Sequence, residues 1–378
     1  MGAVRDVVIV GGGIGGLSLA VALRRVGVGA RIVEKGSRAN RLGTGISLLG
    51  NTLRALDALG LADICVAAGH GYDSVKTRDA TGRLIDEMRP PRTFRADRPG
   101  AFGIMRPVLA DILENAATSA GASIEFEATV TAFEQRSDGI DVTLSTGERV
   151  SADLVVGADG AYSATRSAVF GDAFAPAYCG QSGIRLTAAR PASMDGVTFY
   201  RAPEGDVVGA IPLSRERCYY FVLETGERQN YLEPARIAEI WRNRMKPFSA
   251  PELVETAEMV SADSPISYRP FDVLMMPLPW HRGRVVLLGD ALHSMSPQLT
   301  SGGGMAIEDA VVLAEILANA TDVEAALTAF GERREPRVRG IFETSLGICE
   351  LEQSPSFEGH KKSMELMGRG FQLLAEPM

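Results

Sequence analysis

The chain contains 378 residues, of which 46% are hydrophobic and 23% are charged, and its formal net charge is −8. This length exceeds that of a usual single hydrophobic core, so we expect two lobes. The composition is that of an ordinary globular protein, and the negative charge argues against a protein that binds nucleic acid or anionic membranes broadly.

The four cysteines are widely separated, with no CxxC pair and no histidine at metal-ligand spacing. This pattern indicates no metal site and favours free thiols that fill the core of a cytoplasmic protein. The first expected strand begins within a few residues of Met1, so we expect no signal peptide.

An uncharged run extends from Val7 to Leu23, which is near the lower limit for a membrane-spanning helix. Five glycines between positions 11 and 16 would weaken such a helix, whereas a strand, a tight turn and a helix would use them directly. We therefore predict a buried strand over residues 7–10, a glycine turn over 11–16 and a helix over 17–25.

The glycine turn fits the GxGxxG spacing at Gly11, Gly13 and Gly16. One glycine permits the turn, one lets the backbone approach a pyrophosphate, and one lets the helix pack on the strand. The next expected strand ends at Glu34, eighteen residues after Gly16, where a carboxylate can accept hydrogen bonds from an adenosine ribose. The alternative for Glu34 is a solvated strand end.

The following segments alternate between helical and strand patterns. Leucines 53, 56 and 59 predict an amphipathic helix, and Thr81-Gly82 predicts the turn of a hairpin. Segment 89–100, rich in arginine and proline, is typical of an irregular crossover. We expect a helix from about Pro107 and then strands with turns near residues 138 and 146, ending in a buried run at 154–156.

From about residue 178 to 268 the pattern predicts an antiparallel sheet, with a helix over 233–245. A parallel-type strand and a long helix then follow, and Pro336 should bend or split the terminal helices. We therefore predict an α/β, two-lobed (α+β) fold. It has a discontinuous Rossmann-like domain (1–75, 101–177 and 265–335), an inserted antiparallel-sheet substrate domain (76–100 and 178–264) and C-terminal helices (336–378).

Two further motifs follow hydrophobic strands. The first delivers Asp159 and Gly160 to the end of its strand, and the second delivers Gly289 and Asp290. Ligands bind at the carboxyl edge of open α/β sheets, so both motifs are expected beside the glycine turn. Either aspartate alone could be a helix cap, but two such motifs after the fingerprint indicate a large dinucleotide.

With these motifs, the sequence resembles the single-component (class A) FAD-dependent aromatic hydroxylases, which include para-hydroxybenzoate hydroxylase, salicylate hydroxylase and kynurenine 3-monooxygenase. The matches cover nearly the whole chain, at GGGIGG, Glu34, GTGISL, the Arg106 segment, GADGAYSATR and GDALH. The resemblance implies that the Rossmann-like domain binds FAD. By matching, the expected FAD contacts are Gly11, Gly13, Ile14, Gly15, Gly16, Glu34, Lys35, Gly45, Ile46, Arg106, Val130, Asp159, Gly160, Gly289, Asp290, Gly302, Gly303 and Gly304.

The resemblance also implies a reaction. NADPH or NADH visits transiently and reduces FAD, dioxygen adds to the reduced flavin, and the C4a-hydroperoxide hydroxylates a small aromatic or heteroaromatic substrate. The protein holds the ring, excludes water and eases removal of a phenolic proton. Neither a nucleic acid nor a membrane is expected as a partner, and the chain is expected to be a monomer or homodimer.

Three residues are expected to contribute to catalysis, namely Arg185, Tyr219 and Pro297. Adjacent Tyr219 and Tyr220 point to opposite faces of a strand, so only one of them can readily face the flavin. The sequence departs from the family where Thr300 and Ser301 replace the usual Gly-Gln, which affects how the flavin ring is positioned.

Other functions stay open at this point. An FAD monooxygenase that tailors a polyketide or antibiotic, by hydroxylation, epoxidation or Baeyer-Villiger insertion, would carry the same motifs. A nucleotide-binding regulator without redox chemistry would not need all three motifs. An NAD-only dehydrogenase would leave Asp159 and Asp290 without an evident purpose.

Overall fold

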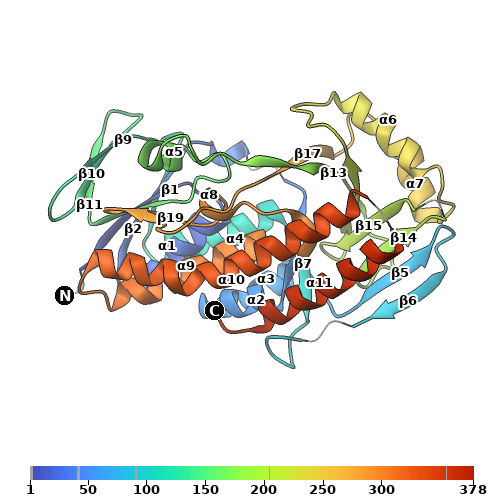
Figure 1. Cartoon of the computed structure of the whole chain (residues 1–378), viewed down its shortest axis with the longest axis horizontal. Coiled ribbons are helices and arrows are strands. Elements are labelled where there is room, and N and C mark those ends of the chain that lie inside the picture. Colours follow the sequence, from blue (N-terminus) through green and yellow to red (C-terminus); the bar gives the residue numbers. More distant parts are fainter. Residues whose placement is uncertain (1–2, 41–42, 90–91, 204, 355) are drawn as a thin grey trace.

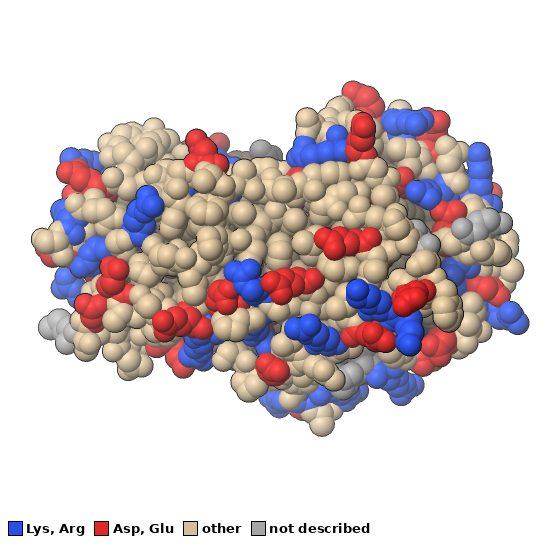
Figure 2. Space-filling view, viewed as in Figure 1, with Lys and Arg blue, Asp and Glu red and all other residues tan. Residues whose placement is uncertain are grey.

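The computed structural model describes residues 3–40, 43–89, 92–203, 205–354 and 356–378. It shows two lobes, with long C-terminal helices lying along both (Figure 1). Pro90 and Pro91 of the expected crossover lie outside the described residues. On the face shown in Figure 2, acidic and basic side chains are interspersed around a largely uncharged centre. None of the described helices is both long and apolar enough to cross a bilayer.

The first lobe is built on a mixed, mostly parallel sheet. Hydrophobic alternation is absent from its central strands because helices and a second sheet cover both faces. Its order is β18 (His281–Arg282), β19 (Val285–Leu287), β12 (Leu154–Gly157), β1 (Asp6–Val10), β2 (Gly29–Glu34) and β8 (Ser123–Phe126). Since β1, β12 and β19 are parallel neighbours, their carboxyl ends lie at one edge.

Helices and two small sheets complete this lobe. On one face lie α1 (Ile14–Arg25), α4 (Arg106–Ser119) and α9 (Gly302–Ala318), and on the other lies the antiparallel sheet of β9 (Val130–Gln135), β10 (Ile140–Leu144) and β11 (Arg149–Ala152). A further sheet joins β3 (Gly45–Leu49), β7 (Ala101–Met105) and β4 (His70–Tyr72). The short elements are η1 (Arg38–Asn40), α2 (Gly50–Ala58), α3 (Ala62–Ala68), α5 (Ala164–Phe170), α8 (Asp290–His293) and η2 (Pro297–Leu299).

The second lobe is a seven-stranded sheet in which all neighbours are antiparallel except β14 and β5. Its order is β17 (Ile266–Val273), β13 (Ala177–Ala189), β16 (Arg217–Thr225), β15 (Val207–Pro212), β14 (Val197–Arg201), β5 (Val75–Asp79) and β6 (Leu84–Met88). Side chains on one face, Tyr220 among them, pack under α6 (Pro234–Met245) and α7 (Pro251–Met259). The hairpin at Gly82 and the α/β fold class are confirmed, whereas the domain boundaries stay predictions.

Two helices end the chain, α10 (Val323–Glu352) and α11 (Phe357–Ala375). The predicted split at Pro336 is wrong, because α10 continues through that residue. Proline removes one backbone donor, but packing of α10 against α9 and α11 keeps the helix formed.

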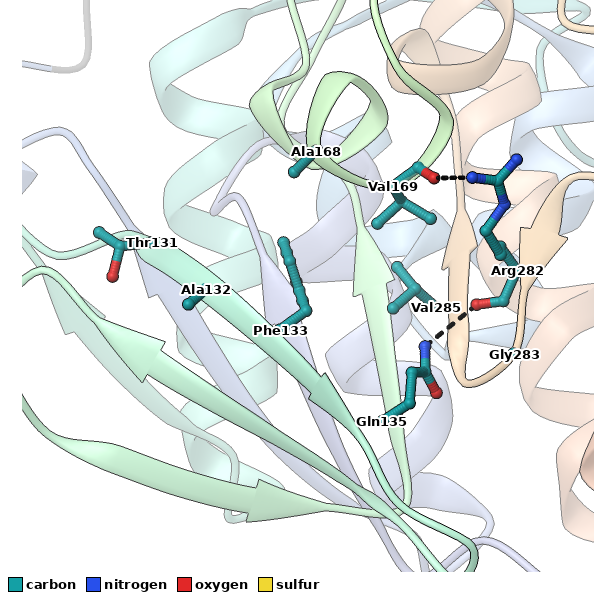
Figure 3. A pocket seen from close by; sticks show the side chains of 9 residues that line it. All are labelled: Thr131, Ala132, Phe133, Gln135, Ala168, Val169, Arg282, Gly283 and Val285. Carbon is teal, nitrogen blue, oxygen red and sulfur yellow. Dashed lines mark hydrogen bonds between the residues drawn. The ribbon is translucent and has the colours of Figure 1, made fainter.

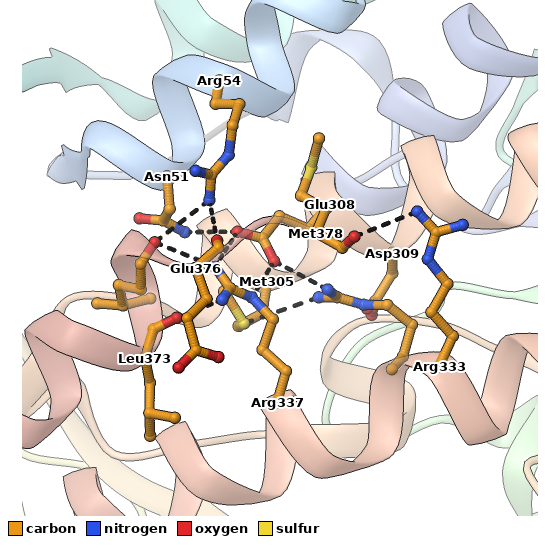
Figure 4. Close-up of polar contacts among 12 residues, drawn as sticks. Asn51, Arg54, Met305, Glu308, Asp309, Arg333, Arg337, Leu373, Glu376 and Met378 are labelled. Carbon is orange, nitrogen blue, oxygen red and sulfur yellow. Dashed lines mark hydrogen bonds and ion pairs between the residues drawn. The ribbon is translucent and has the colours of Figure 1, made fainter. Parts of the chain in front are cut away.

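A buried ion network joins α9 to α10 (Figure 4). The Arg334 Nε donates to Asp309 at 2.8 Å and its terminal nitrogen donates to Glu308 at 2.9 Å. Arg337 also donates to Glu308 at 2.8 Å and to carbonyl groups at the end of α11. All four side chains are buried, so each charge depends on its partners for stabilisation.

We expect Arg334→Met to lower the free energy of unfolding by about 3–5 kcal/mol, because Glu308 and Asp309 would stay buried with fewer partners. Urea denaturation measures this loss. The matched control is Arg333→Met at the neighbouring position, where the ion pair to Glu315 is exposed and should contribute at most about 1 kcal/mol. Equal effects of the two substitutions would contradict the role given to the buried network.

Candidate active site

The glycine turn after β1 touches both later motifs. A Cβ atom at Gly11, where φ is +110°, would lie 2.4 Å from the Ala158 carbonyl oxygen and 2.9 Å from the Asp159 Cα. One at Gly15 would lie 2.8 Å from a Leu288 methyl group. Three loops that are far apart in the sequence therefore meet at the carboxyl edge of the sheet.

Glu34 lies beneath this turn. Its two carboxylate oxygens accept hydrogen bonds from the Gly12 and Gly36 backbone N–H groups, each at 2.6 Å. Gly13, the residue before α1, has no heavy atom within 4 Å of the place where a Cβ would lie. The start of α1 is thus open, with N–H groups and a helix dipole that favour a phosphate. Lys35, the next residue, is exposed. The Ala128 N–H donates a hydrogen bond to the Glu34 carbonyl, which places Val130, the first residue of β9, near this turn.

The second motif forms a tight loop before α5. The Asp159 carboxylate accepts hydrogen bonds from the Ser163 hydroxyl at 2.5 Å and from the Thr165 N–H at 2.9 Å, so its side chain shapes the loop as a cap does. Gly160 has φ of +83° and open space on its Cβ side. Arg166 ties this loop to the third motif, donating to the Ala291 carbonyl at 2.8 Å.

In the third motif, Gly289 adopts φ of +61°, and its N–H donates to Asp309 at 3.2 Å. Asp290 follows, and its carboxylate has no hydrogen bond to any described residue. A Cβ at Gly302 would lie 3.9 Å from its Oδ1 atom. The start of α9 packs closely on the first lobe, since Gly303 contacts Ile46 and Gly304 contacts Thr52; Gly45 lies against Leu213 of the second lobe.

Asp290 and Arg106 lie where the two lobes meet. Both side chains keep a large exposed fraction, yet protein surrounds them densely enough to shift their pKa values. From this combination we infer that they border a recess between the lobes. Burial raises the pKa of Asp290, against the effects of His293 and Arg106, and burial lowers the pKa of Arg106.

One face of the second-lobe sheet supplies the opposite wall. Arg185 is the cross-strand neighbour of Phe221, whose ring lies 5.9 Å from that of Tyr219. Arg269 lies on the adjacent strand β17, and it acts electrostatically on Arg106 together with Arg185 and Tyr219. Burial raises the pKa of the Tyr219 phenol, although Arg185 and Arg106 oppose the rise.

The guanidinium groups of Arg106, Arg185 and Arg269 form no hydrogen bond or ion pair with any residue that the structure describes. Asp290 is the carboxylate that most strongly opposes the lowering of the Arg106 pKa. The recess therefore carries an excess of positive charge next to an aromatic wall.

The predicted Pro297 begins η2, which leads to Thr300 in the left-handed region at φ of +49°. Leu299 N–H and the Ser296 carbonyl both bond to the Ser345 hydroxyl, at 3.4 and 2.8 Å, so this loop is held by α10. Two other tyrosines of this sheet lie on its opposite side: Tyr200 donates to Glu252 under the helices of the second lobe, and Tyr220 is in that core too.

Sequence reasoning did not find Phe221 or Arg269. Phe221 stands two residues after Tyr219 in a strand, so the period-two rule places it on the same face. For Arg269 the sequence offers no comparable signal, because its place depends on which strand pairs with β13.

A surface depression of about 610 Å³ lies away from this recess, between the β9 sheet, α5 and the β18–β19 turn (Figure 3). Its polar side chains already have partners: Gln135 donates to the Arg282 carbonyl, and Arg282 donates to the Val169 carbonyl at 2.7 Å. Gly283 in its wall precedes β19, so the depression lies at the amino edge of the parallel strands, opposite the three motifs.

The family model described as "FAD binding domain" matches residues 5–345. The chain is 31% identical over 351 residues to the aurachin C monooxygenase/isomerase of Stigmatella aurantiaca, covering 92% of this chain and 89% of that protein. It is 29% identical over 391 aligned positions to the FAD-dependent urate hydroxylase of Klebsiella pneumoniae, covering 98% and 94%.

A solved structure of a Klebsiella pneumoniae HpxO variant complexed with FAD superposes with a TM-score of 0.83 at 25% identity, covering 99% of this chain and 95% of that one. The residues of the three motifs fit this cofactor, because the open start of α1, Glu34 and the unpartnered Asp290 lie along one edge of the sheet. The chain belongs to the class A FAD-dependent aromatic hydroxylase/monooxygenase family and is an FAD-binding flavoprotein.

Proposed function

We propose that this protein uses NADPH or NADH and dioxygen to hydroxylate a small aromatic or heteroaromatic substrate that carries a negative charge. The observation that carries this proposal is the set of three guanidinium groups near Tyr219 and Phe221 that have no hydrogen-bond or ion-pair partner among the described residues. A cationic recess with an aromatic wall suits a planar anion, such as a phenolate, a carboxylate or a deprotonated heterocycle.

Within this proposal, the chain's own residues hold FAD at several points. The start of α1 would hold the pyrophosphate, Glu34 would lie at the adenosine ribose, and Asp290 would hold the ribityl chain. Arg106 is close to Asp290 and to Arg185 and Tyr219 of the second lobe, and it would stabilise negative charge on the flavin ring. Bound and reduced FAD supplies the chemistry that activates dioxygen, which no side chain of the protein can supply.

The second lobe positions the substrate. Arg185 and Arg269 bind its negative charge, while Phe221 and Tyr219 pack on its ring. A tyrosine hydroxyl is protonated near neutral pH, and burial raises the pKa of Tyr219 further, so this hydroxyl can donate a hydrogen bond to a phenolate oxygen. Pro297 and η2 close the recess from the α10 side and exclude water.

The direct test is aerobic turnover by the yellow holoprotein. Anionic aromatic compounds, including urate, hydroxybenzoates and hydroxypyridine carboxylates, should accelerate NADH or NADPH oxidation, and the product should contain one oxygen atom from labelled dioxygen. Peroxide release without a labelled product identifies an effector rather than a substrate. If no aromatic anion yields a labelled product while a neutral aromatic does, the proposed substrate class is wrong.

Arg185→Gln and Arg269→Gln should each weaken binding of the anionic substrate about 10- to 100-fold, the value of a hydrogen bond to a charged group. The bound FAD content should be unchanged, since neither residue belongs to a nucleotide motif. The matched control is Arg236→Gln in α6, whose partner Glu239 is on the same exposed helix. Isothermal titration at two salt concentrations measures the loss; an equal loss in the control variant would contradict the assignment.

Asp290→Asn should separate stability from cofactor binding. A carboxyl group whose pKa is raised by folding stabilises the fold below its unfolded pKa, and this contribution is lost as the pH rises through the folded pKa. The Asn apoprotein should therefore unfold at a higher temperature than the wild type at pH 7, and this difference should shrink toward pH about 4.

The same variant should bind FAD about 10- to 100-fold more weakly, because an amide replaces a charged acceptor. Flavin fluorescence quenching on titration of apoprotein measures the affinity, and the exposed Asp172→Asn serves as control. Unchanged FAD affinity together with unchanged stability would remove Asp290 from the site.

A second candidate is the tailoring of a polyketide or antibiotic by hydroxylation, epoxidation or Baeyer-Villiger insertion, and the printed name of one relative, aurachin C monooxygenase/isomerase, likewise couples oxygen transfer to a second reaction. Structure determination of the labelled product separates the two reactions, because hydroxylation leaves the ring intact whereas insertion expands it.

A further inference from the structure

Two cysteines that the sequence separates by most of the chain lie together at the junction of the two lobes and the C-terminal helices. Cys179 in β13 and Cys349 in α10 have their sulfur atoms 3.5 Å apart, and both thiols are free. Because β13 belongs to the inserted sheet and α10 spans both lobes, a bond between these residues would add a covalent link between elements that are otherwise held by packing and hydrogen bonds.

The surroundings fix this pair. The Gln353 amide donates to the Cys179 carbonyl at 2.9 Å, and the Cys349 Sγ also lies 3.2 Å from the Gln181 side-chain oxygen. Gly180 adopts φ of +92° where the ladder of β13 with β17 is interrupted, and a Cβ there would lie 2.1 Å from the Gln353 Oε1. The backbone on both sides is therefore held in place without a covalent bond.

The two thiols differ in accessibility and acidity. Cys179 is half-buried, whereas Cys349 is buried. The hydrogen bond from Cys349 lowers the pKa of Cys179 below its ordinary value, and the same contact raises the pKa of Cys349. Cys179 thus has the accessible thiolate that attacks an oxidant, and Cys349 is the adjacent thiol that can displace the product.

We propose that Cys179 and Cys349 form a peroxide-sensitive thiol pair that cross-links the inserted sheet to α10. The Cys179 sulfur attacks hydrogen peroxide, so that an S–O bond forms, the O–O bond breaks and the leaving hydroxide takes up a proton to become water. The Cys349 sulfur then attacks the sulfenic sulfur, the S–O bond breaks, and the Cys349 proton leaves with the hydroxide as a second water. Two thiols and one peroxide give one disulfide and two waters.

The pair is also linked by hydrogen bonds to the loop that contains Pro297. Gln181 accepts a hydrogen bond from Gln298 at 2.7 Å, and Gln298 directly follows Pro297. Gln298 donates to Glu352 at 3.1 Å as well, one turn after Cys349 in α10. Oxidation converts the Cys349 thiol to a disulfide and so removes its hydrogen bond to Gln181. This loss occurs next to the loop that contains Pro297 and Gln298.

The experiment treats the holoprotein with hydrogen peroxide, then alkylates all free thiols under denaturing conditions and maps the peptides by mass spectrometry. We expect a cross-linked peptide that joins residues 179 and 349, with a loss of about 2 Da, the mass of two hydrogens, reversed by dithiothreitol. The oxidised protein should also unfold at a higher temperature, because the bond closes a long loop.

Two of the four cysteines provide the matched controls. Cys65 and Cys218 are buried, and burial raises the pKa of each to about 12, so Cys65→Ser and Cys218→Ser should leave the cross-link intact. Cys349→Ser should instead leave a Cys179 sulfenic acid that dimedone traps. Full alkylation of both Cys179 and Cys349 in the peroxide-treated wild type, or a cross-link through Cys65 or Cys218, would overturn the proposal. The added peroxide makes this test independent of any monooxygenase turnover.

Discussion

The close approach of three backbone loops at the glycine turn is the constraint on which the site depends. Side-chain atoms at Gly11 or Gly15 would overlap the second or third motif, and one at Gly16 would lie 2.0 Å from the Gly11 carbonyl oxygen. At Gly11 and Gly16 the close atoms are backbone atoms, and a backbone that is held in a buried parallel sheet cannot move aside for a side chain. Glycine at these positions therefore brings Glu34, the Gly160 loop and Asp290 to one edge.

Charge in the recess is kept separate from charge in the core. Asp309 pairs with His293 and Arg334, and although burial raises the pKa of Asp309, these two partners outweigh it and hold that pKa at about 2. Asp290 stands only one position from Gly289, which bonds to this network, but it has no such partners. The network thus fixes the backbone of the third motif while leaving the Asp290 carboxylate available to a ligand.

The parts of the fold that follow from local patterns could be predicted from the sequence. The strand, turn and helix of the first motif, the start of α4 at Arg106 and the opposite orientation of Tyr219 and Tyr220 all follow from glycine spacing, proline placement and period-two alternation. The continuity of α10 through Pro336 could not, since it depends on packing against other helices. The proximity of Cys179 to Cys349 and of Arg269 to Arg106 likewise depends on the tertiary arrangement, and no local sequence pattern predicts it.

The conformation of Thr300 shows how α10 acts on the loop beside the recess. A β-branched residue in the left-handed region costs of order 1–3 kcal/mol, so the loop keeps this conformation only because other contacts determine it. Those contacts come from α10, where the Ser345 hydroxyl bonds to the loop on both sides of Pro297. In turn α10 is held by the Arg334 network at one point, and further along its Cys349 lies beside Cys179 of β13. A displacement of α10 would therefore release the strain at Thr300 and move Pro297, which makes this helix the element through which changes outside the recess act on its closing loop.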